Sequence, residues 1–318
     1  MPKIPSAQLS SAEISKKLPD DVKAKVDIQV KKAMSWIDHQ PERRIKSCGT
    51  HRSVQQALQS YARWIAYNRL GNLQRSTPRS AESFLVERSS LVTQKTLDQL
   101  RQAIEIYQHV SGRLPEDQHL TIITSHVETR LEHRAYTAEQ VAAVATRQTE
   151  RNALATELAF NAGLRAHELI TIRPIGEQPP DKRDAEGKPR LGTKFNGREG
   201  VLYTVVGKGG LCREVLLRKD LADRLEAHRR PEPVEVRDRG VIYQSHYDIG
   251  YGNAFSRSFT DASKRALGWS TGAHGLRHSY VQERMKELRS HCDYETSLST
   301  VSQEVGHFRS DITLIYQR

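Results

Sequence analysis

The chain contains little cysteine, and its three cysteines form no recognisable pattern. Cys48, Cys212 and Cys292 are spread over 318 residues, without the CxxC spacing that indicates a zinc or redox site. Secreted domains that depend on disulfides carry an even and denser set of cysteines. We therefore expect no disulfide framework and a protein of a reducing compartment.

Long hydrophobic runs are also missing from the sequence. No stretch of about eighteen consecutive apolar residues occurs, which is the length that a membrane-spanning helix needs. The first residues, MPKIPSAQLSSAEISKKLPDD, lack the apolar segment of a signal peptide. The sequence therefore predicts a soluble, cytoplasmic protein. It also contains no ATP-binding motif, so we expect chemistry that does not depend on nucleotide hydrolysis.

Basic residues are what the chain has in excess. Its 49 lysines and arginines outnumber its 38 aspartates and glutamates, which gives a formal net charge of +11. A surface of this kind attracts polyanions, and nucleic acid is the commonest polyanionic partner. An excess of basic residues also keeps proteins soluble. The charge alone is thus compatible with a nucleic-acid partner and with a surface that has no such partner.

The apolar pattern divides the chain into three segments. Residues 1–47 carry apolar side chains at helical spacing from Val22 to Ile37, which predicts a helical N-terminal extension. Residues 48–130 predict a compact helical bundle. Residues 131–318 mix helices with strands and are long enough to form a larger domain with its own core.

Start and stop signals place the helices of the bundle. A capping box of Ser53 and Gln56 predicts the start of its first helix. Two more helices are expected over 81–88, after the Thr77-Pro78 start signal, and over 97–107. A short helix is expected over 119–129, where the chain enters the third segment.

The third segment predicts an α+β domain that is mainly α-helical, with a small antiparallel sheet. Thr137 and Gln140 form a capping box for one helix over 137–163, which Gly163 would end or kink. The polar stretch 176–200 is typical of a surface loop. Strands and helices are expected at these positions: strands over 170–174, 201–206 and 212–217, and helices over 219–229, 254–267 and 280–289.

A set of six residues in this segment carries the chemistry. A guanidinium group binds two phosphate oxygens at once, imidazole moves protons near neutral pH, and a phenol can attack phosphorus. Such a combination suits the cleavage of a phosphodiester. The six residues are Arg165, Lys208, His274, Arg277, His307 and Tyr316.

The order and spacing of four motifs resemble the tyrosine recombinase family, which includes the phage-type integrases. The motifs are NAGLRAHEL at 161–169, VVGKGG at 205–210, HGLRHSY at 274–280 and GHFRSDITLIY at 306–316. The resemblance covers the third segment as the catalytic domain. Residues 48–130 are similar, more weakly, to the core-binding DNA-binding domain of that family, and residues 1–47 fall outside it.

The residues and the resemblance together give each group a role. Arg165 and Arg277 would neutralise the nonbridging oxygens, and Tyr316 would attack phosphorus to form a 3′-phosphotyrosine and a free 5′-hydroxyl. By resemblance, His274 is the base that accepts the tyrosine proton. Lys208, on the glycine-flanked hairpin turn, would protonate the leaving oxygen.

Two further assignments concern groups around the phosphate. His307 would donate a hydrogen bond to a nonbridging oxygen. Glu168 either holds a guanidinium or a neighbouring histidine in place, or forms an ordinary surface pair. His278 lies beside the motif residues but off the pattern, and we interpret it as structural or solvent-facing.

The resemblance implies a site-specific recombinase or integrase of a mobile genetic element that uses no metal, ATP or other cofactor. Its partners would be double-stranded DNA, three more copies of the chain on synapsed DNA sites, and accessory DNA-bending proteins, with the bound protein at the nucleoid. Two alternatives stay open. One is a type IB topoisomerase-like enzyme that relaxes DNA, and the other is a catalytically inactive DNA-binding protein of the same fold.

Overall fold

The structure is a computed structural model of the chain. It describes residues 5–6, 9–40, 45, 48–128, 132–181, 191–238, 240–307 and 311–317, without the side chains of Cys48, Lys208, Asp311, Ile312 and Gln317. The chain divides into two compact units, Met1–Arg130 and Leu131–Arg318. Within the described residues, no helix is both long enough and apolar enough to cross a membrane.

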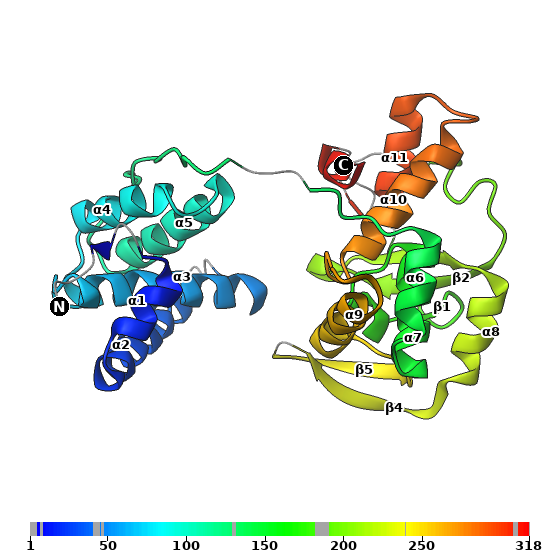
Figure 1. The fold of residues 1–318 in the computed structure, drawn as a ribbon, viewed down its shortest axis with the longest axis horizontal. Coiled ribbons are helices and arrows are strands. Elements are labelled where there is room, and N and C mark those ends of the chain that lie inside the picture. Colours follow the sequence, from blue (N-terminus) through cyan, green and yellow to red (C-terminus); the bar gives the residue numbers. More distant parts are fainter. Residues whose placement is uncertain are drawn as a thin grey trace. The chain divides into compact units, whose positions relative to one another are not determined.

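Packed helices build the first unit (Figure 1). They are α1 (Ser11–Lys17), α2 (Asp20–Asp38), α3 (Cys48–Tyr67), α4 (Pro78–Ser89) and α5 (Gln94–Val110), with the short 3₁₀ turn η2 (Leu73–Arg75). The predicted start signal at Thr77-Pro78 is confirmed, because the Thr77 hydroxyl accepts a hydrogen bond from the Ser80 backbone and Pro78 opens α4.

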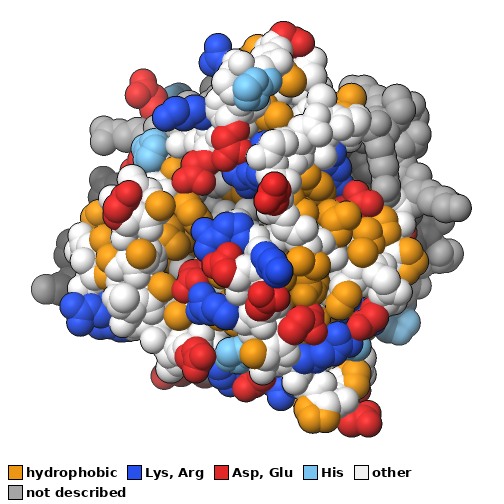
Figure 2. Space-filling model, turned by 90° about the vertical axis from the view of Figure 1, so that its right-hand side faces the viewer, with side chains coloured by type: hydrophobic (Ala, Val, Ile, Leu, Met, Phe, Trp, Pro, Cys, Tyr) orange, Lys and Arg blue, Asp and Glu red, His pale blue; other side chains and the backbone are white. Residues whose placement is uncertain are grey.

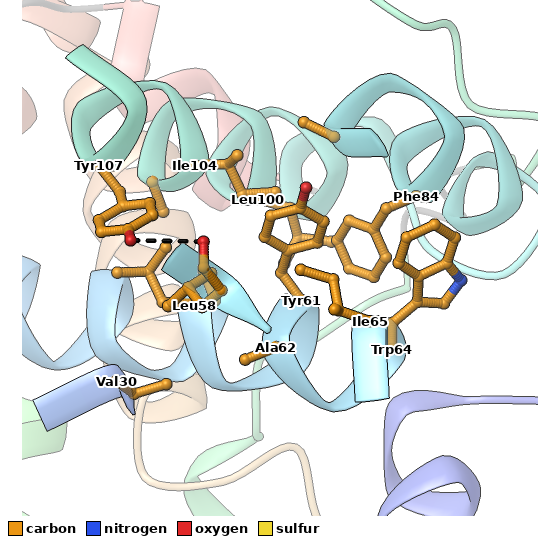
Figure 3. Packing of buried hydrophobic residues seen from close by; sticks show 14 of the residues in the cluster. Val30, Leu58, Tyr61, Ala62, Trp64, Ile65, Phe84, Leu100, Ile104 and Tyr107 are labelled. Carbon is orange, nitrogen blue, oxygen red and sulfur yellow. Dashed lines mark hydrogen bonds between the residues drawn. The ribbon is translucent and has the colours of Figure 1, made fainter. Parts of the chain in front are cut away.

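An aromatic cluster fills the core of this unit (Figure 3). The rings of Tyr61, Trp64 and Phe84 pack against one another at centroid distances of 5.1 to 6.1 Å. Their polar atoms are satisfied, since the Tyr61 hydroxyl pairs with Ser80 and the Trp64 ring nitrogen donates to Glu87. The cluster therefore contributes apolar burial without leaving buried polar groups unpaired.

The N-terminal segment, which the sequence set apart as an extension, shares this core. Ile14, Val26 and Ile37 belong to the same buried cluster as Tyr61. Buried Arg88 on α4 reaches back to the segment and donates hydrogen bonds to the backbone oxygens of Leu9 and Ser6. Residues before 48 are thus part of the first unit.

Two helix predictions in this unit were wrong. The helix expected to begin at Ser53 begins at Cys48, so Ser53 lies inside α3, where its hydroxyl donates to the Gly49 carbonyl instead of capping. Residues 119–128 form no helix. Their contacts explain this, because side chains such as Gln94 and Glu82 bind the backbone of Ser125 and Thr121 and hold the segment extended.

Helices cover small antiparallel sheets in the second unit, which confirms the predicted fold class (Figure 1). The elements before the first sheet are α6 (Ala138–Ala145), α7 (Glu150–Ala162) and η3 (Glu168–Ile170). The sheet has the order β1–β2–β3, from β1 (Arg173–Pro174), β2 (Val201–Val206) and β3 (Cys212–Leu217), and the turn η4 (Lys208–Gly210) joins β2 to β3.

The capping box of Thr137 and Gln140 is confirmed, but the single helix predicted over 137–163 is two helices. The Thr146 hydroxyl donates to the Ala143 carbonyl, and extended backbone at Thr149 starts the second helix. Threonine side chains compete for backbone groups in this way and weaken a helix. Gly163 ends α7 in the left-handed conformation, as expected.

The rest of the second unit begins with α8 (Lys219–Ala227) and a long hairpin, β4 (Arg229–Asp238) and β5 (Val241–Tyr247). Prolines occupy positions 231 and 233 of β4, and this hairpin was not predicted. A two-stranded ribbon has two open edges, so proline can occupy it without losing a ladder bond, and the pairing register shifts between Arg229 and Val234 where the prolines lie.

The last elements are helical and contact one another. They are α9 (Gly252–Leu267), α10 (Gly275–Leu288), α11 (Tyr294–Glu304), α12 (Asp311–Leu314) and the turn η5 (Ile315–Gln317). Helix α10 begins five residues before the predicted 280, and α11 was not predicted. Turn η5 packs on α10, which brings the end of the chain to the start of the HGLRHSY motif.

Candidate active site

Glu168 lies at the centre of the site. It is fully buried in η3, and its carboxylate accepts hydrogen bonds from Arg165 Nη1 (2.7 Å) and Arg213 Nη2 (2.8 Å). Arg277 Nη1 lies 3.8 Å from the oxygen that Arg213 binds. Burial alone would raise the pKa of Glu168, but the three guanidinium charges outweigh burial and hold this pKa well below its usual range. Glu168 therefore forms no surface pair.

Arg165 owes its place to the turn that ends α7. Gly163 has φ of +59°, and a Cβ there would lie 2.7 Å from the Tyr280 ring on α10. Only glycine allows both the turn and this approach of the two helices. Beyond the turn, the Arg165 guanidinium pairs with Glu168, and its side chain keeps 22% of its surface exposed. It is the arginine of the pair that solvent, and hence a phosphate, can reach directly.

Arg277 lies on α10, fully buried behind this position. Its Nη1 donates to the Gly163 carbonyl (2.6 Å), and its Nη2 donates to the Val305 carbonyl and to His307 Nε2. Among the residues that the structure describes, none forms a hydrogen bond with Arg277 Nε. Burial, and then the charge of Arg165, lower the pKa of Arg277 to about 9, so that it remains a fixed positive charge at neutral pH.

Tyr316 packs into the same site from turn η5. Its hydroxyl lies 3.1 Å from His274 Nε2. Its ring centroid lies 4.5 Å from that of His278, 5.2 Å from His307 and 5.4 Å from His274. The guanidinium carbon of Arg277 lies 5.8 Å from the ring. The structure thus brings the tyrosine, two predicted histidines and both arginines together within one unit.

Burial keeps the three histidines around Tyr316 neutral at pH 7. It lowers the pKa of His274 and of His278 to about 4, and that of His307 to about 3. Arg277 adds to this effect in each case, since a nearby positive charge disfavours protonation. A neutral His274 can accept the proton of the tyrosine hydroxyl that it contacts.

His307 belongs to a chain of hydrogen bonds. Its Nδ1 lies 2.9 Å from the Thr313 hydroxyl, which donates to the Ser302 hydroxyl at 3.0 Å. His307 Nδ1 therefore carries the proton, and its Nε2 accepts from Arg277. If the Thr313 hydroxyl turns to donate to Nδ1, the proton moves to Nε2, which is the arrangement that binding a phosphate oxygen requires.

Lys208 begins the turn between β2 and β3, and its side chain lies outside the described atoms. The turn is tight, because Gly209 and Gly210 both have positive φ and the Gly207 amide donates to the Leu211 carbonyl. At Gly207, a Cβ would lie 3.3 Å from Glu168 Oε1. The residue before Lys208 therefore packs directly on the carboxylate that holds Arg165.

Several buried groups were not found from the sequence. His278, interpreted as structural or solvent-facing, is buried against the Tyr316 ring; its spacing of four residues from His274, which places both on one helix face, was the signal. Glu304 is buried and accepts from the Tyr280 hydroxyl (2.8 Å) and from Arg284 (3.1 Å). Arg213 was also missed, and both lack a sequence signal because their partners are distant in the chain.

Two other features lie outside this site, a group of potential metal ligands and a hollow. Glu105, His109 and His119 in the first unit place one ligand atom each within 4.8 Å of one another. Glu105 already accepts hydrogen bonds from Arg101 and His119, so protein contacts account for this group. In the second unit, a hollow of about 860 Å³ lies beside α6, α7 and β3, and none of the five candidate residues whose side chains are described lines it.

The side chains on one face of the molecule mix both signs of charge with apolar groups (Figure 2). Basic and acidic side chains alternate over its centre, with hydrophobic groups between them. The excess of positive charge is therefore not gathered into one patch on this face.

No protein-family model and no curated protein matches the sequence. Solved structures do match the fold. They include a λ integrase dimer bound to a core site (TM-score 0.55, 15% identity, 89% of this chain and 94% of that one) and XerH recombinase bound to a palindromic difH substrate (TM-score 0.53, 14% identity, 95% and 94%). The Tn1549 transposon integrase with transposon-end DNA also matches (TM-score 0.53, 13% identity, 92% and 94%).

These proteins share only 13–15% of their residues with this chain, so the likeness concerns the fold alone. It extends over about nine tenths of the chain or more. The arrangement of residues around Tyr316 was established above from the structure of this chain. This protein has the fold of the site-specific recombinases and integrases.

Proposed function

We propose that the protein is a site-specific DNA recombinase of the tyrosine recombinase family, which cuts and rejoins DNA through a 3′-phosphotyrosine. The Tyr316 oxygen forms a bond to phosphorus while the bond from phosphorus to the 5′-oxygen breaks. The tyrosine proton passes to His274, and a proton from Lys208 goes to the leaving oxygen. Rejoining is the reverse reaction, so the energy of the broken bond is conserved and no nucleotide is consumed.

One observation carries this proposal: the Tyr316 hydroxyl lies 3.1 Å from the neutral Nε2 of His274, among fixed positive groups. A phenol with a pKa of about 10 is a poor nucleophile at neutral pH without a base. A base within hydrogen-bond distance meets the geometric requirement for general base catalysis. The buried charge of Arg277 favours the phenolate that forms.

The remaining groups suit the charge that develops on phosphorus. Arg165 is partly exposed and can bind a nonbridging oxygen, and His307 can donate to another from Nε2 once Thr313 turns. Fixed donors in a buried site typically contribute about a hundred-fold or more in rate each. The Lys208 turn packs against Glu168 beside Arg165, which supports the assignment of Lys208 as the proton donor to the leaving oxygen.

The substrate in this proposal is double-stranded DNA, and the assembly is a tetramer on two synapsed sites. Lysine and arginine outnumber aspartate and glutamate by 20 to 13 in residues 1–130 and by 29 to 25 in residues 131–318. Phosphate contacts account for most of the affinity of a DNA-binding protein. We therefore expect the first unit to supply most of the electrostatic affinity and the second unit the chemistry.

The test begins with a library of nicked DNA duplexes that have a randomised central segment. The protein is incubated with the library, denatured in SDS, and examined for DNA that stays covalently attached; the attached strands are then sequenced. We expect one family of sequences joined through the 3′-phosphate to Tyr316, no metal requirement in EDTA, and complete loss of the adduct in Tyr316→Phe.

Other outcomes have definite meanings. No adduct, together with sequence-selective binding, would assign the protein to the inactive DNA-binding class and contradict the proposal. Adducts without sequence preference, with relaxation of a supercoiled plasmid, would assign it to the topoisomerase class. Strand exchange between two copies of the recovered sequence would distinguish a recombinase from both.

A further inference from the structure

Arg213 is a buried charged residue that the mechanism above does not use. It lies on β3, where it pairs with Val205 of β2, and it retains 5% of its surface. Its Nη2 donates to Glu168 Oε2 at 2.8 Å, and its Nη1 donates to the backbone carbonyl of Glu304 at 2.6 Å. A single side chain thus joins the lysine-bearing hairpin, the arginine-binding carboxylate and the end of α11.

The contact with Glu168 fixes the direction of Arg165. The Arg165 guanidinium binds Glu168 Oε1, whereas Oε2 accepts from the Arg165 backbone amide and from Arg213, so two arginines set the direction of the carboxylate. Without Arg213, Oε2 would keep the backbone amide but lose a charged donor, and the carboxylate could tilt toward Arg277, which lies 3.8 Å away. The partly exposed guanidinium of Arg165 would then be held less firmly.

The contact with Glu304 fixes the path of the chain that follows α11. The next residues are Val305, whose carbonyl holds Arg277, and His307, whose Nε2 faces the same arginine. Gly306 lies between them with φ of +69°, and a Cβ there would lie 2.6 Å from Arg213 Cδ. The stem of Arg213 therefore packs directly on the segment that carries His307.

The position of Arg213 is a poor one for stability alone. Its Nε is buried and has no hydrogen-bond partner within the described part of the chain, and burying such a donor opposes folding. Replacement of buried ion pairs by apolar residues is often neutral or stabilising. A charged group held in such a place is better explained by what it positions than by its contribution to folding.

We infer that Arg213 is a positioning residue that holds the Lys208 turn, the Arg165–Glu168 pair and the His307 segment in register for strand cleavage. The inference rests on the proposed function. It predicts that loss of Arg213 disturbs both halves of the reaction, the stabilisation of charge on phosphorus and the protonation of the leaving oxygen.

The test uses the duplex recovered with the wild-type protein, made with the ordinary phosphate and with a 5′-bridging phosphorothiolate at the cut. A sulfur leaving group needs no proton, so the modified duplex removes the need for a general acid. Cleavage of both duplexes is measured for Arg213→Met and Arg213→Lys, and DNA affinity is measured in parallel. Lys208→Ala and Arg165→Ala serve as reference variants. We expect the phosphorothiolate to restore cleavage by Lys208→Ala, which lacks only the general acid, and not cleavage by Arg165→Ala.

For Arg213→Met we expect about a hundred-fold slower cleavage of the ordinary duplex, with affinity within about three-fold of wild type. With the phosphorothiolate duplex, Arg213→Met should regain only part of the lost cleavage rate. Arg213→Lys keeps the charge and one donor and should lie between wild type and methionine. Lys194→Met is the matched control, because it breaks the ion pair that Lys194 forms with Glu214 of β3 (3.0 Å), a pair that includes neither Glu168 nor Glu304.

Three results would overturn the inference. The first is a rate of cleavage by Arg213→Met, per folded molecule, that equals the rate of the Lys194→Met control. The second is complete restoration by sulfur, which would confine Arg213 to the Lys208 turn. The third is failure of both Arg213 variants to fold, measured by circular dichroism, which would make the residue structural. A wild-type protein that forms no adduct with either duplex rejects the proposed function itself and the inference with it.

Discussion

The two units are stabilised in different ways. The first unit buries rings and aliphatic groups, with the Tyr61, Trp64 and Phe84 cluster at its centre, and its buried Arg88 binds backbone oxygens. The second unit also has an apolar core, but it buries Glu168 and Glu304 with arginines around them. Apolar burial favours folding directly, whereas buried charges oppose it unless every partner is in place. The difference indicates that the second unit gives up stability for a fixed arrangement of charges.

The comparison is tested most strongly by Glu168→Gln. This change removes the one negative charge shared by Arg165, Arg213 and Arg277, whose like charges then repel each other. We expect a loss of about 3–5 kcal/mol in the free energy of unfolding of the second unit, and cleavage at least about a hundred-fold slower. Urea unfolding with hydrogen exchange of peptides from each unit measures the first effect.

The control for this variant is Glu157→Gln, which removes a carboxylate paired with Arg224 on the surface. Exposed pairs contribute little, so a change below about 1 kcal/mol is expected. Equal effects of the two substitutions would contradict the special role of the buried carboxylate.

Phe84→Ala tests the other side of the comparison. The ring is fully buried between Tyr61 and Trp64, and its removal should cost about 3–5 kcal/mol through lost burial and the cavity left behind. We expect faster hydrogen exchange in peptides from α3 to α5 and unchanged exchange around Tyr316. Val86→Ala on the same helix, where the side chain is 54% exposed, should have little effect. Faster exchange at Tyr316 would show that the first core also supports the site.

Mild acid should affect the units unequally. His274, His278 and His307 have a lowered pKa in the folded protein, so between pH 6.5 and about 4 the unfolded chain binds more protons than the folded one. Stability of the second unit therefore falls as the pH falls through this window, by on the order of 1–2 kcal/mol for each of the three rings between pH 7 and pH 5. Calorimetry of the full chain at both values measures it, and His307→Asn should reduce the difference. If the stability of the second unit did not change between these pH values, the burial of these rings would be contradicted.

Local signals predicted elements wherever short-range contacts decide the structure. The Thr137 capping box, the Thr77-Pro78 start and the Gly163 stop are all present because each needs only neighbouring residues. The β2–β3 hairpin was predicted for the same reason, since its glycine-rich turn determines its own geometry.

Predictions failed where distant partners decide the structure. Ser53 and Gln56 have the sequence of a capping box, but α3 already begins at Cys48, and His51 in its first turns pairs with Asp38 of α2. Helix α11 has a weakly apolar sequence and depends on its contacts with α10. The candidate site follows the same division. Its motif residues could be named from spacing, whereas Arg213 and Glu304 become significant only once the fold brings β3 and α11 together.

The way Arg277 is held has a consequence for sequence drift. Two of its bonds go to main-chain carbonyls, those of Gly163 and Val305, and every amino acid supplies a carbonyl. A mutation at Val305 that preserves the local path keeps the oxygen in place whatever side chain it introduces. The side chain at position 305 can therefore change without loss of this anchor, whereas position 163 must stay glycine because of its own turn.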